Sequence, residues 1–179
     1  LMIVNQMRFL SLLLACGALS AQPAYDLLLK GGHLIDPKNR IDGPSDVAIK
    51  DGKIAAIAAS IPAAQARKTV QVNGLYVVPG LIDLHAHVFS GTEGKGLAGG
   101  DSSIHPDSFA QRVGVTTLVD AGSSGRHTFP EFRRTIVDKA RTRVLVFLNI
   151  GGQGMPGDAN EQNLDDMDSK ASAALAAAN

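Results

Sequence analysis

A pair of histidines separated by one residue is the pattern with the clearest chemistry in this chain. His85 and His87 end the apolar run Leu81–His87, which predicts a buried strand. Side chains two positions apart on a strand point to the same face, so both imidazoles can reach one cation at about 2.0–2.1 Å. Asp83 lies on the same face, where its carboxylate would brace a metal ligand or the end of the strand. The simpler alternative is two polar residues at the mouth of a strand, because a histidine pair alone is a modest signal for a metal.

Polar residues also end the two apolar strands predicted further along the chain. Asp120 ends the first of them, and Asn149 lies near the end of the second. Barrel enzymes place functional residues at such strand ends, so Asp120 is a candidate for the pocket or for supporting the metal ligands. The alternative is that Asp120 caps the turn that follows it. Ser123 and Ser124 in that turn either contact substrate or serve a tight turn, and they do not form the G-x-S-x-G motif of a serine hydrolase.

The other three histidines are expected to face solvent. His33 lies in a predicted hairpin, and His105 and His127 lie in predicted loops. Only His105 is a candidate to approach a substrate, from the long loop that runs between residues 90 and 104. That loop is itself a candidate lid, because the function of barrel enzymes concentrates in such loops.

Three pairs of short strands are expected before these residues, each pair joined by a tight turn. Asp51-Gly52 and Asn73-Gly74 are strong hairpin signals, because a type I′ turn needs positive φ at both central residues. Gly31-Gly32 marks the third turn. The expected strand pairs are 27–29 with 34–35, 47–49 with 54–57, and 70–72 with 75–78. We therefore expect a small β-rich module over residues 25–75.

From residue 76 onward, strands and helices are expected to alternate. Such an order predicts βα units on a parallel sheet that is covered on both faces. A complete TIM barrel takes about 250 residues, so residues 76–179 would supply three of its eight strands, as a truncated barrel; a smaller open α/β domain is the alternative. The expected strands are 81–87, 113–120 and 143–150, and the expected helices are 106–112, 129–140 and 164–178.

Composition excludes several classes of function. The 179 residues contain 17 Lys and Arg against 17 Asp and Glu, so the formal net charge is +0 and there is no broad basic field for nucleic acid. Aromatic residues make up only 4%, with no Trp, which speaks against a stacking surface for single strands. With 45% hydrophobic and 19% charged residues the chain can bury a core. A single cysteine excludes an internal disulfide framework.

The first 24 residues read as an export signal. Met7-Arg8 precedes the short apolar run Phe9–Ala15, which is far below the roughly 20 residues of a membrane-spanning helix. Cys16 ends this run in a pattern that resembles a bacterial lipobox, and ordinary cleavage after a small residue is the alternative. Either reading places the mature protein outside the cytoplasm, in the periplasm, with contact to a membrane only through a lipid on Cys16.

The chain resembles the amidohydrolase superfamily. The segment Val78–His87 is similar to that superfamily's PGxIDxHxH signature, and two earlier segments are similar to its β-sandwich start. Three later segments resemble the deacetylase and dihydroorotase-like branch of metal-dependent hydrolases. The earlier segments are 26–32 and 46–54, and the later ones are 114–125, 147–150 and 161–168.

This resemblance implies a (β/α)8 barrel beside a small β-sandwich. It implies that His85 and His87 hold the more buried of one or two divalent metal ions, usually zinc. The family's carboxylated lysine, its two later histidines and its final aspartate are expected beyond Asn179, so this fragment is expected to be inactive alone.

The implied reaction is hydrolysis of a C–N bond (amide or cyclic amide) or an acyl bond of a small molecule by metal-activated water. The alternative is an exported, non-catalytic α/β module that binds a small molecule. An oligomer is compatible with either.

Overall fold

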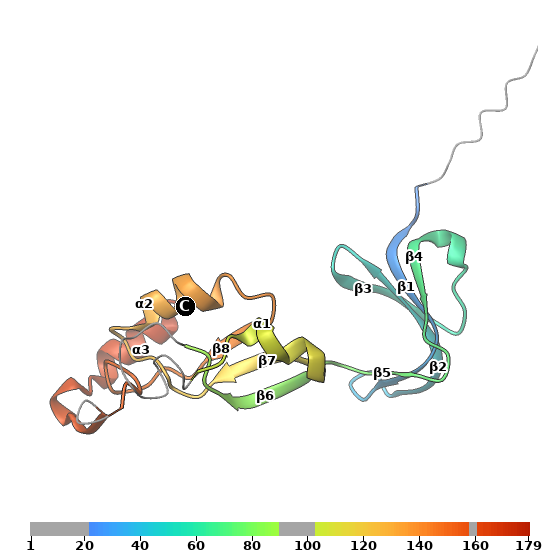
Figure 1. Ribbon diagram of the computed structural model, residues 1–179. Helices are drawn as coiled ribbons and strands as arrows, with labels where there is room; N and C mark the ends of the chain where they lie inside the picture. The colour runs from blue at the N-terminus through green and yellow to red at the C-terminus, as the bar shows by residue number, and fades with distance from the viewer. Residues whose placement is uncertain (1–21, 90–102, 158–160) are drawn as a thin grey trace, which may run out of the picture. The chain divides into compact units, whose positions relative to one another are not determined.

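The computed structural model describes residues 22–89, 103–157 and 161–179 and divides into two compact units, with the boundary between Val78 and Pro79 (Figure 1). The predicted export segment, with Cys16 and the lipobox-like run, lies outside the described residues except for its last three positions. Most of the predicted lid also lies outside them. In the parts of the chain described, no helix is both long and apolar enough to cross a membrane.

The first unit is built on one five-stranded sheet. Its strands follow the order β3-β2-β1-β4, and β5 also pairs with β1. β1 is antiparallel to β2 and parallel to β4 and β5. The elements are β1 (Tyr25–Asp36), β2 (Ile41–Lys50), β3 (Lys53–Ala58), the 3-10 turn η1 (Ala63–Gln65), β4 (Ala66–Gln71) and β5 (Tyr76–Val77).

The expected hairpin at Gly31-Gly32 is wrong, because β1 runs through both glycines as one strand of 12 residues. The glycines form an irregularity, where the register against β2 shifts between Leu29 and Gly32. Gly31 has φ 79°, and a Cβ there would lie 2.1 Å from the Asn73 side-chain oxygen. A tight contact and a positive φ therefore require glycine here, and the pair does not reverse the chain.

Of the two hairpins predicted at Asp51-Gly52 and Asn73-Gly74, the first is confirmed and the second is wrong. Asp51 and Gly52 have φ values of 50° and 71° and join β2 to β3 in an antiparallel pair. The Asn73-Gly74 turn does not pair its flanking strands. Instead β4 and β5 both pair in parallel with β1, at successive positions along the same strand. The turn therefore moves the chain along one edge of β1.

A buried carboxylate holds the first unit together. Asp46 accepts hydrogen bonds from the Lys30 ammonium (2.8 Å) and from the backbone N–H groups of Gly31 (2.7 Å) and Ile61 (2.8 Å). Burial acts to raise the pKa of the Asp46 carboxyl, but the hydrogen bonds outweigh it and hold the pKa below its ordinary value of 3.8. Ile61 packs with Leu28 in the small apolar core beside this carboxylate.

We expect Asp46→Asn to lower the free energy of unfolding by about 2 kcal/mol at pH 7, because the ionised oxygens accept three hydrogen bonds. The folded pKa lies below 3.8, so this stabilisation is complete above that value and is lost as the pH falls through the folded pKa. Urea unfolding at pH 7 and pH 3 measures both effects. The variant should lose less stability between the two pH values than the wild type. Asp42→Asn, at an exposed carboxylate, is the control; an equal pH dependence in wild type and Asp46→Asn would contradict the assignment.

The second unit contains a parallel sheet of three strands in the order β6-β7-β8. Its chain order of strand, helix, strand, helix, strand and helix is the predicted one, so the mixed α/β class is confirmed. The elements are β6 (Leu81–Ala86), α1 (Pro106–Phe109), the 3-10 turn η3 (Ala110–Val113), β7 (Val115–Asp120), α2 (Phe129–Phe132), the π-helical turn η4 (Arg133–Val137), β8 (Arg143–Val146), the 3-10 turn η6 (Leu164–Asp166) and α3 (Ser169–Ala177).

Several of these elements are shorter than their sequence patterns predict. β8 ends at Val146 instead of residue 150, because the chain leaves the sheet to bond the loop after β7, with Asn149 N–H donating to the Ser124 carbonyl (2.9 Å). The last helix begins at Ser169 instead of residue 164, because the Asp168 side chain accepts from the Ala171 N–H and caps it there. The helix expected over 129–140 is α2 followed by the π-helical turn η4.

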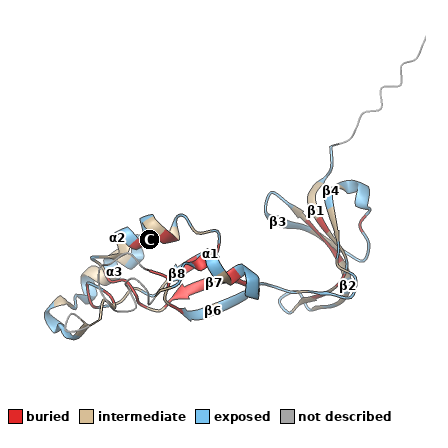
Figure 2. Ribbon diagram, in the orientation of Figure 1, coloured by how far each residue is buried: buried red, intermediate tan, exposed pale blue. Residues whose placement is uncertain are grey.

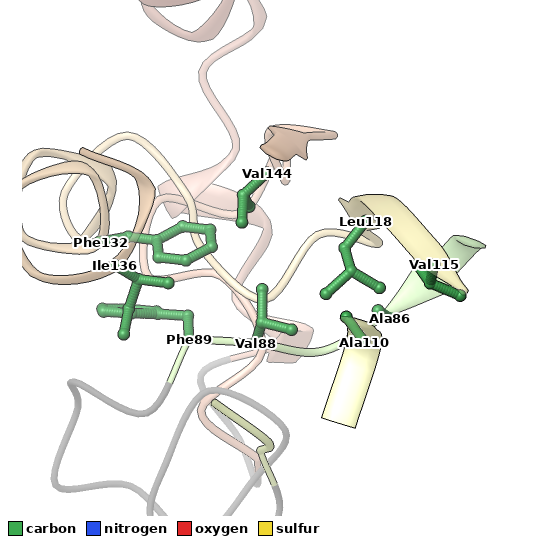
Figure 3. Close-up of a cluster of buried hydrophobic side chains, with 9 residues drawn as sticks. All are labelled: Ala86, Val88, Phe89, Ala110, Val115, Leu118, Phe132, Ile136 and Val144. Carbon is green, nitrogen blue, oxygen red and sulfur yellow. The ribbon is translucent and has the colours of Figure 1, made fainter. Parts of the chain in front are cut away.

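The core of the second unit joins the sheet to its helices. Phe89 and Phe132 are fully buried with ring centroids 4.7 Å apart, and Leu118 and Val144 pair in register across β7 and β8. Figure 3 shows these side chains converging with those of Ala86, Val88, Ala110, Val115 and Ile136. In Figure 2 the central strand β7 is mostly buried, whereas β6 is mostly exposed. A parallel sheet covered on both faces was expected to be buried throughout. β7 largely meets this expectation, and β6 does not.

Candidate active site

The structure places the two histidines of the predicted metal pair side by side. His85 is the penultimate residue of β6, and His87 directly follows the strand. Their ring centroids lie 5.4 Å apart, with the ring planes inclined at 73°. His85 is exposed and His87 is half-buried. Both imidazoles therefore lie near the carboxyl end of the sheet, within reach of a shared ion.

A serine from the neighbouring strand end fixes the His87 ring. Nδ1 of His87 lies 2.9 Å from the hydroxyl oxygen of Ser123, which is fully buried in the loop after β7. The bond engages Nδ1, and Nε2 takes no part in it. Imidazole ligands of metals commonly use their second nitrogen in this way, and the bond sets the orientation of the ring.

The Asp120 carboxylate hydrogen-bonds to the backbone next to His87 and in the loop after β7. The residue is fully buried, and its two carboxylate oxygens accept from the N–H groups of Ser123 (2.7 Å) and Val88 (2.9 Å). Asp120 therefore caps the turn that follows it, which was one of the two alternatives. The same carboxylate also accepts from the N–H of Val88, the residue after His87. Its carboxylate supports the site through the backbone.

Asp83 and Asn149 are also used by the backbone. The Asp83 carboxylate accepts from the His85 N–H at 3.0 Å, so it braces the strand end. The Asn149 amide donates to the Gly122 carbonyl (3.0 Å) and accepts from the Gly151 N–H (2.9 Å), so it joins the loops after β7 and β8. Both side chains hold the frame of the site.

Sequence reasoning missed the bond between His87 and Ser123. The spacing of Asp120 and Ser123 carried a signal, because a carboxylate that caps a turn accepts the N–H three residues later. That spacing predicts where the backbone of Ser123 lies. It does not predict the partner of its hydroxyl, which is 36 residues away in the chain.

The other histidines are used elsewhere. His33 lies 2.6 Å from an Asp42 oxygen in the first unit, in a strand and not in the predicted hairpin turn. His105 caps α1 and accepts from the Asp107 N–H. His127 lies 3.0 Å from an Asp166 oxygen. Among the described residues no three His, Cys, Asp or Glu side chains come together as a metal site, so the pair of His85 and His87 has no third such side chain beside it there.

No family model matches the chain. It is 40% identical over 105 residues to a deacetylase of Agrobacterium fabrum, covering 59% of this chain and 24% of that protein. It is 36% identical over 132 residues to a deacetylase of Enterococcus faecalis (73% of this chain, 32% of that protein) and 45% identical over 69 residues to a dihydroorotase of Elusimicrobium minutum (38% and 16%). The chain thus spans a third or less of the length of these relatives.

Solved structures of proteins with related names are similar to this chain in fold. A crystal structure of a dihydroorotase superposes with a TM-score of 0.68 at 32% identity, over 86% of this chain and 39% of that chain. A crystal structure of an adenine deaminase superposes with the same TM-score and identity, over 83% and 37%. The similar proteins carry three different names: deacetylase, dihydroorotase and adenine deaminase. The chain belongs to the amidohydrolase superfamily.

Proposed function

We propose that this chain supplies the first metal ligands of a metal-dependent hydrolase that cleaves a C–N (amide or cyclic amide) or acyl bond of a small molecule. The observation that carries the proposal is the pair of imidazoles 5.4 Å apart, one of them oriented by a buried serine. The names of the relatives support it, because a deacetylase and a dihydroorotase are both hydrolases.

The donor set fits a borderline-soft cation such as zinc. Two neutral imidazoles are zinc ligands, but a catalytic zinc site uses three protein ligands and keeps one position open. The described residues offer only two. We therefore propose that the remaining ligands, and the carboxylate that moves a proton, come from other parts of the protein.

We further propose that β6, β7 and β8 are three neighbouring strands of a (β/α)8 barrel, and that the first unit belongs to a β-sandwich. Three observations support the barrel: the strands are parallel, they are adjacent in chain order, and the histidine pair lies at their carboxyl ends. Active sites of such barrels lie at that end.

In the proposed mechanism this chain binds and orients. His85 and His87 hold the ion, and Ser123 and Asp120 hold His87 in place. When bound, a zinc ion supplies a water of lowered pKa and polarises the carbonyl of the substrate. Asp83 and Asp120 keep their carboxylates on backbone N–H groups, so the proposed mechanism does not assign the proton transfer to them.

The test is metal analysis and a substrate screen of the protein expressed from its complete reading frame. We expect one or two zinc ions per chain and turnover of at least one of three classes: N-acyl amino acids, cyclic amides such as hydantoins, and acetyl esters. A protein that binds a small molecule but holds no metal and turns over none of them would support the non-catalytic binding module instead.

We also propose that the protein is exported. The short basic start at Arg8 and the apolar run before Cys16 support the proposal. Fractionation of cells that express the complete protein tests it, because recovery of all the protein in the cytosol would contradict export.

A further inference from the structure

We infer that Ser123 is the positioning residue that selects the metal-binding form of His87: its hydroxyl oxygen accepts a hydrogen bond from Nδ1–H, so that Nε2 carries the free lone pair. The inference rests on the proposed function, since it concerns the same site. It assigns to Ser123 a role that differs from substrate contact and from a simple turn.

The hydrogen bond between His87 and Ser123 can run in either direction. A neutral imidazole carries its proton on one nitrogen and accepts with the other. Nδ1 of His87 lies 2.9 Å from the Ser123 hydroxyl oxygen. When the hydroxyl accepts, Nδ1 is protonated and Nε2 is the ligand; when it donates, Nε2 is protonated and cannot bind a metal without losing that proton.

The backbone of Ser123 is held by its neighbours. Its N–H donates to Asp120 (2.7 Å), and its carbonyl accepts from the Met155 N–H (3.0 Å). Gly154 packs against it so closely that a Cβ at Gly154 would lie 2.2 Å from the Ser123 carbonyl oxygen. The backbone of Ser123 is therefore held on three sides, so its hydroxyl occupies a fixed place before any metal arrives.

Hydrogen bonds also join the end of β6 to the end of β7. The same Asp120 carboxylate that holds Ser123 also accepts from the Val88 N–H, the residue after His87. The Ala121 N–H donates to the Ala86 carbonyl (2.8 Å), the residue before His87. The backbone on each side of His87 is thus hydrogen-bonded to the strand end that leads into Ser123. These bonds fix the distance between the backbones that carry the imidazole and the hydroxyl.

The neighbouring serine provides a matched comparison. Ser124 is as completely buried as Ser123, but its hydroxyl has no hydrogen-bond partner among the residues that the structure describes. Ser124→Ala therefore removes the same atom from the same loop without touching His87. Any difference between the two alanine variants reports the bond to His87 and not the loss of a buried hydroxyl.

The experiment compares Ser123→Ala and Ser124→Ala in the complete protein. We expect Ser123→Ala to raise the zinc dissociation constant about tenfold or more, the usual effect of losing a partner behind a metal ligand. Ser124→Ala should stay within about twofold of the wild type. Both metal-free variants should melt within a few degrees of each other. Equal zinc affinity in the two variants would overturn the inference.

A second measurement does not depend on any variant folding. Nitrogen-15 NMR of the metal-free wild type, labelled at histidine and assigned with His87→Gln, reports which ring nitrogen is protonated. The inference expects Nδ1–H for His87, and a neutral ring protonated at Nε2 would overturn it. A wild type that holds no zinc would overturn the proposed function instead, and the NMR result would still decide the role of Ser123.

Discussion

The His87→Ala variant of the complete protein is expected to retain less than about a tenth of the wild-type zinc and to lose on the order of a thousandfold in kcat/KM. His87 is one of the two proposed metal ligands among the described residues, and its ring is hydrogen-bonded to Ser123. Its loss removes a bond to the metal itself, so the effect should exceed the roughly tenfold change in zinc affinity expected for Ser123→Ala. Metal analysis and steady-state kinetics on an active substrate measure both quantities.

His33→Ala is the control for this variant. His33 is a histidine of the first unit whose ring contacts Asp42 and Tyr76. Its replacement should leave the zinc content unchanged. Wild-type zinc content and wild-type turnover in His87→Ala would show that the histidine pair is not the metal site.

The second large effect is expected at Asp120. We expect Asp120→Ala to lower the free energy of unfolding by about 3 kcal/mol, because two buried N–H groups, of Ser123 and Val88, lose the acceptor that the described residues give them. Urea unfolding monitored by circular dichroism measures the change.

Asp83→Ala provides the comparison for this prediction. Asp83 also accepts a backbone N–H, but it is half-buried and makes one such bond. Its loss should cost less than about 1 kcal/mol. A similar cost at the two positions would mean that the Asp120 carboxylate does not hold the two strand ends together.

The sequence predicted the strands of the second unit and the pairing of the histidines because both depend on local rules. β6 and β7 are apolar runs near the predicted positions, and alternation along a strand is enough to expect His85 and His87 on one side. The Asp51-Gly52 hairpin follows for the same reason, since its turn is set by two adjacent residues.

The features that the sequence did not predict depend on contacts between distant segments. Gly31 lies inside β1, which pairs with β2 and β4, and β4 pairs with β1 instead of with the strand that follows it. The partner of the Ser123 hydroxyl is likewise set by the arrangement of two strand ends. Periodicity and turn propensity contain no information on which distant segment will be the neighbour.

The exposed strand β6 has a consequence for how the protein is made. It pairs with β7 on one side only, and Leu81, Ile82 and Leu84 are each more than half exposed in the described residues. Unpaired apolar strands recruit other chains. On the ribosome β6 emerges before the β7 strand with which it pairs, so aggregation competes with folding during that interval. Slower synthesis at low temperature, or co-expression of chaperones, should therefore raise the yield of native protein.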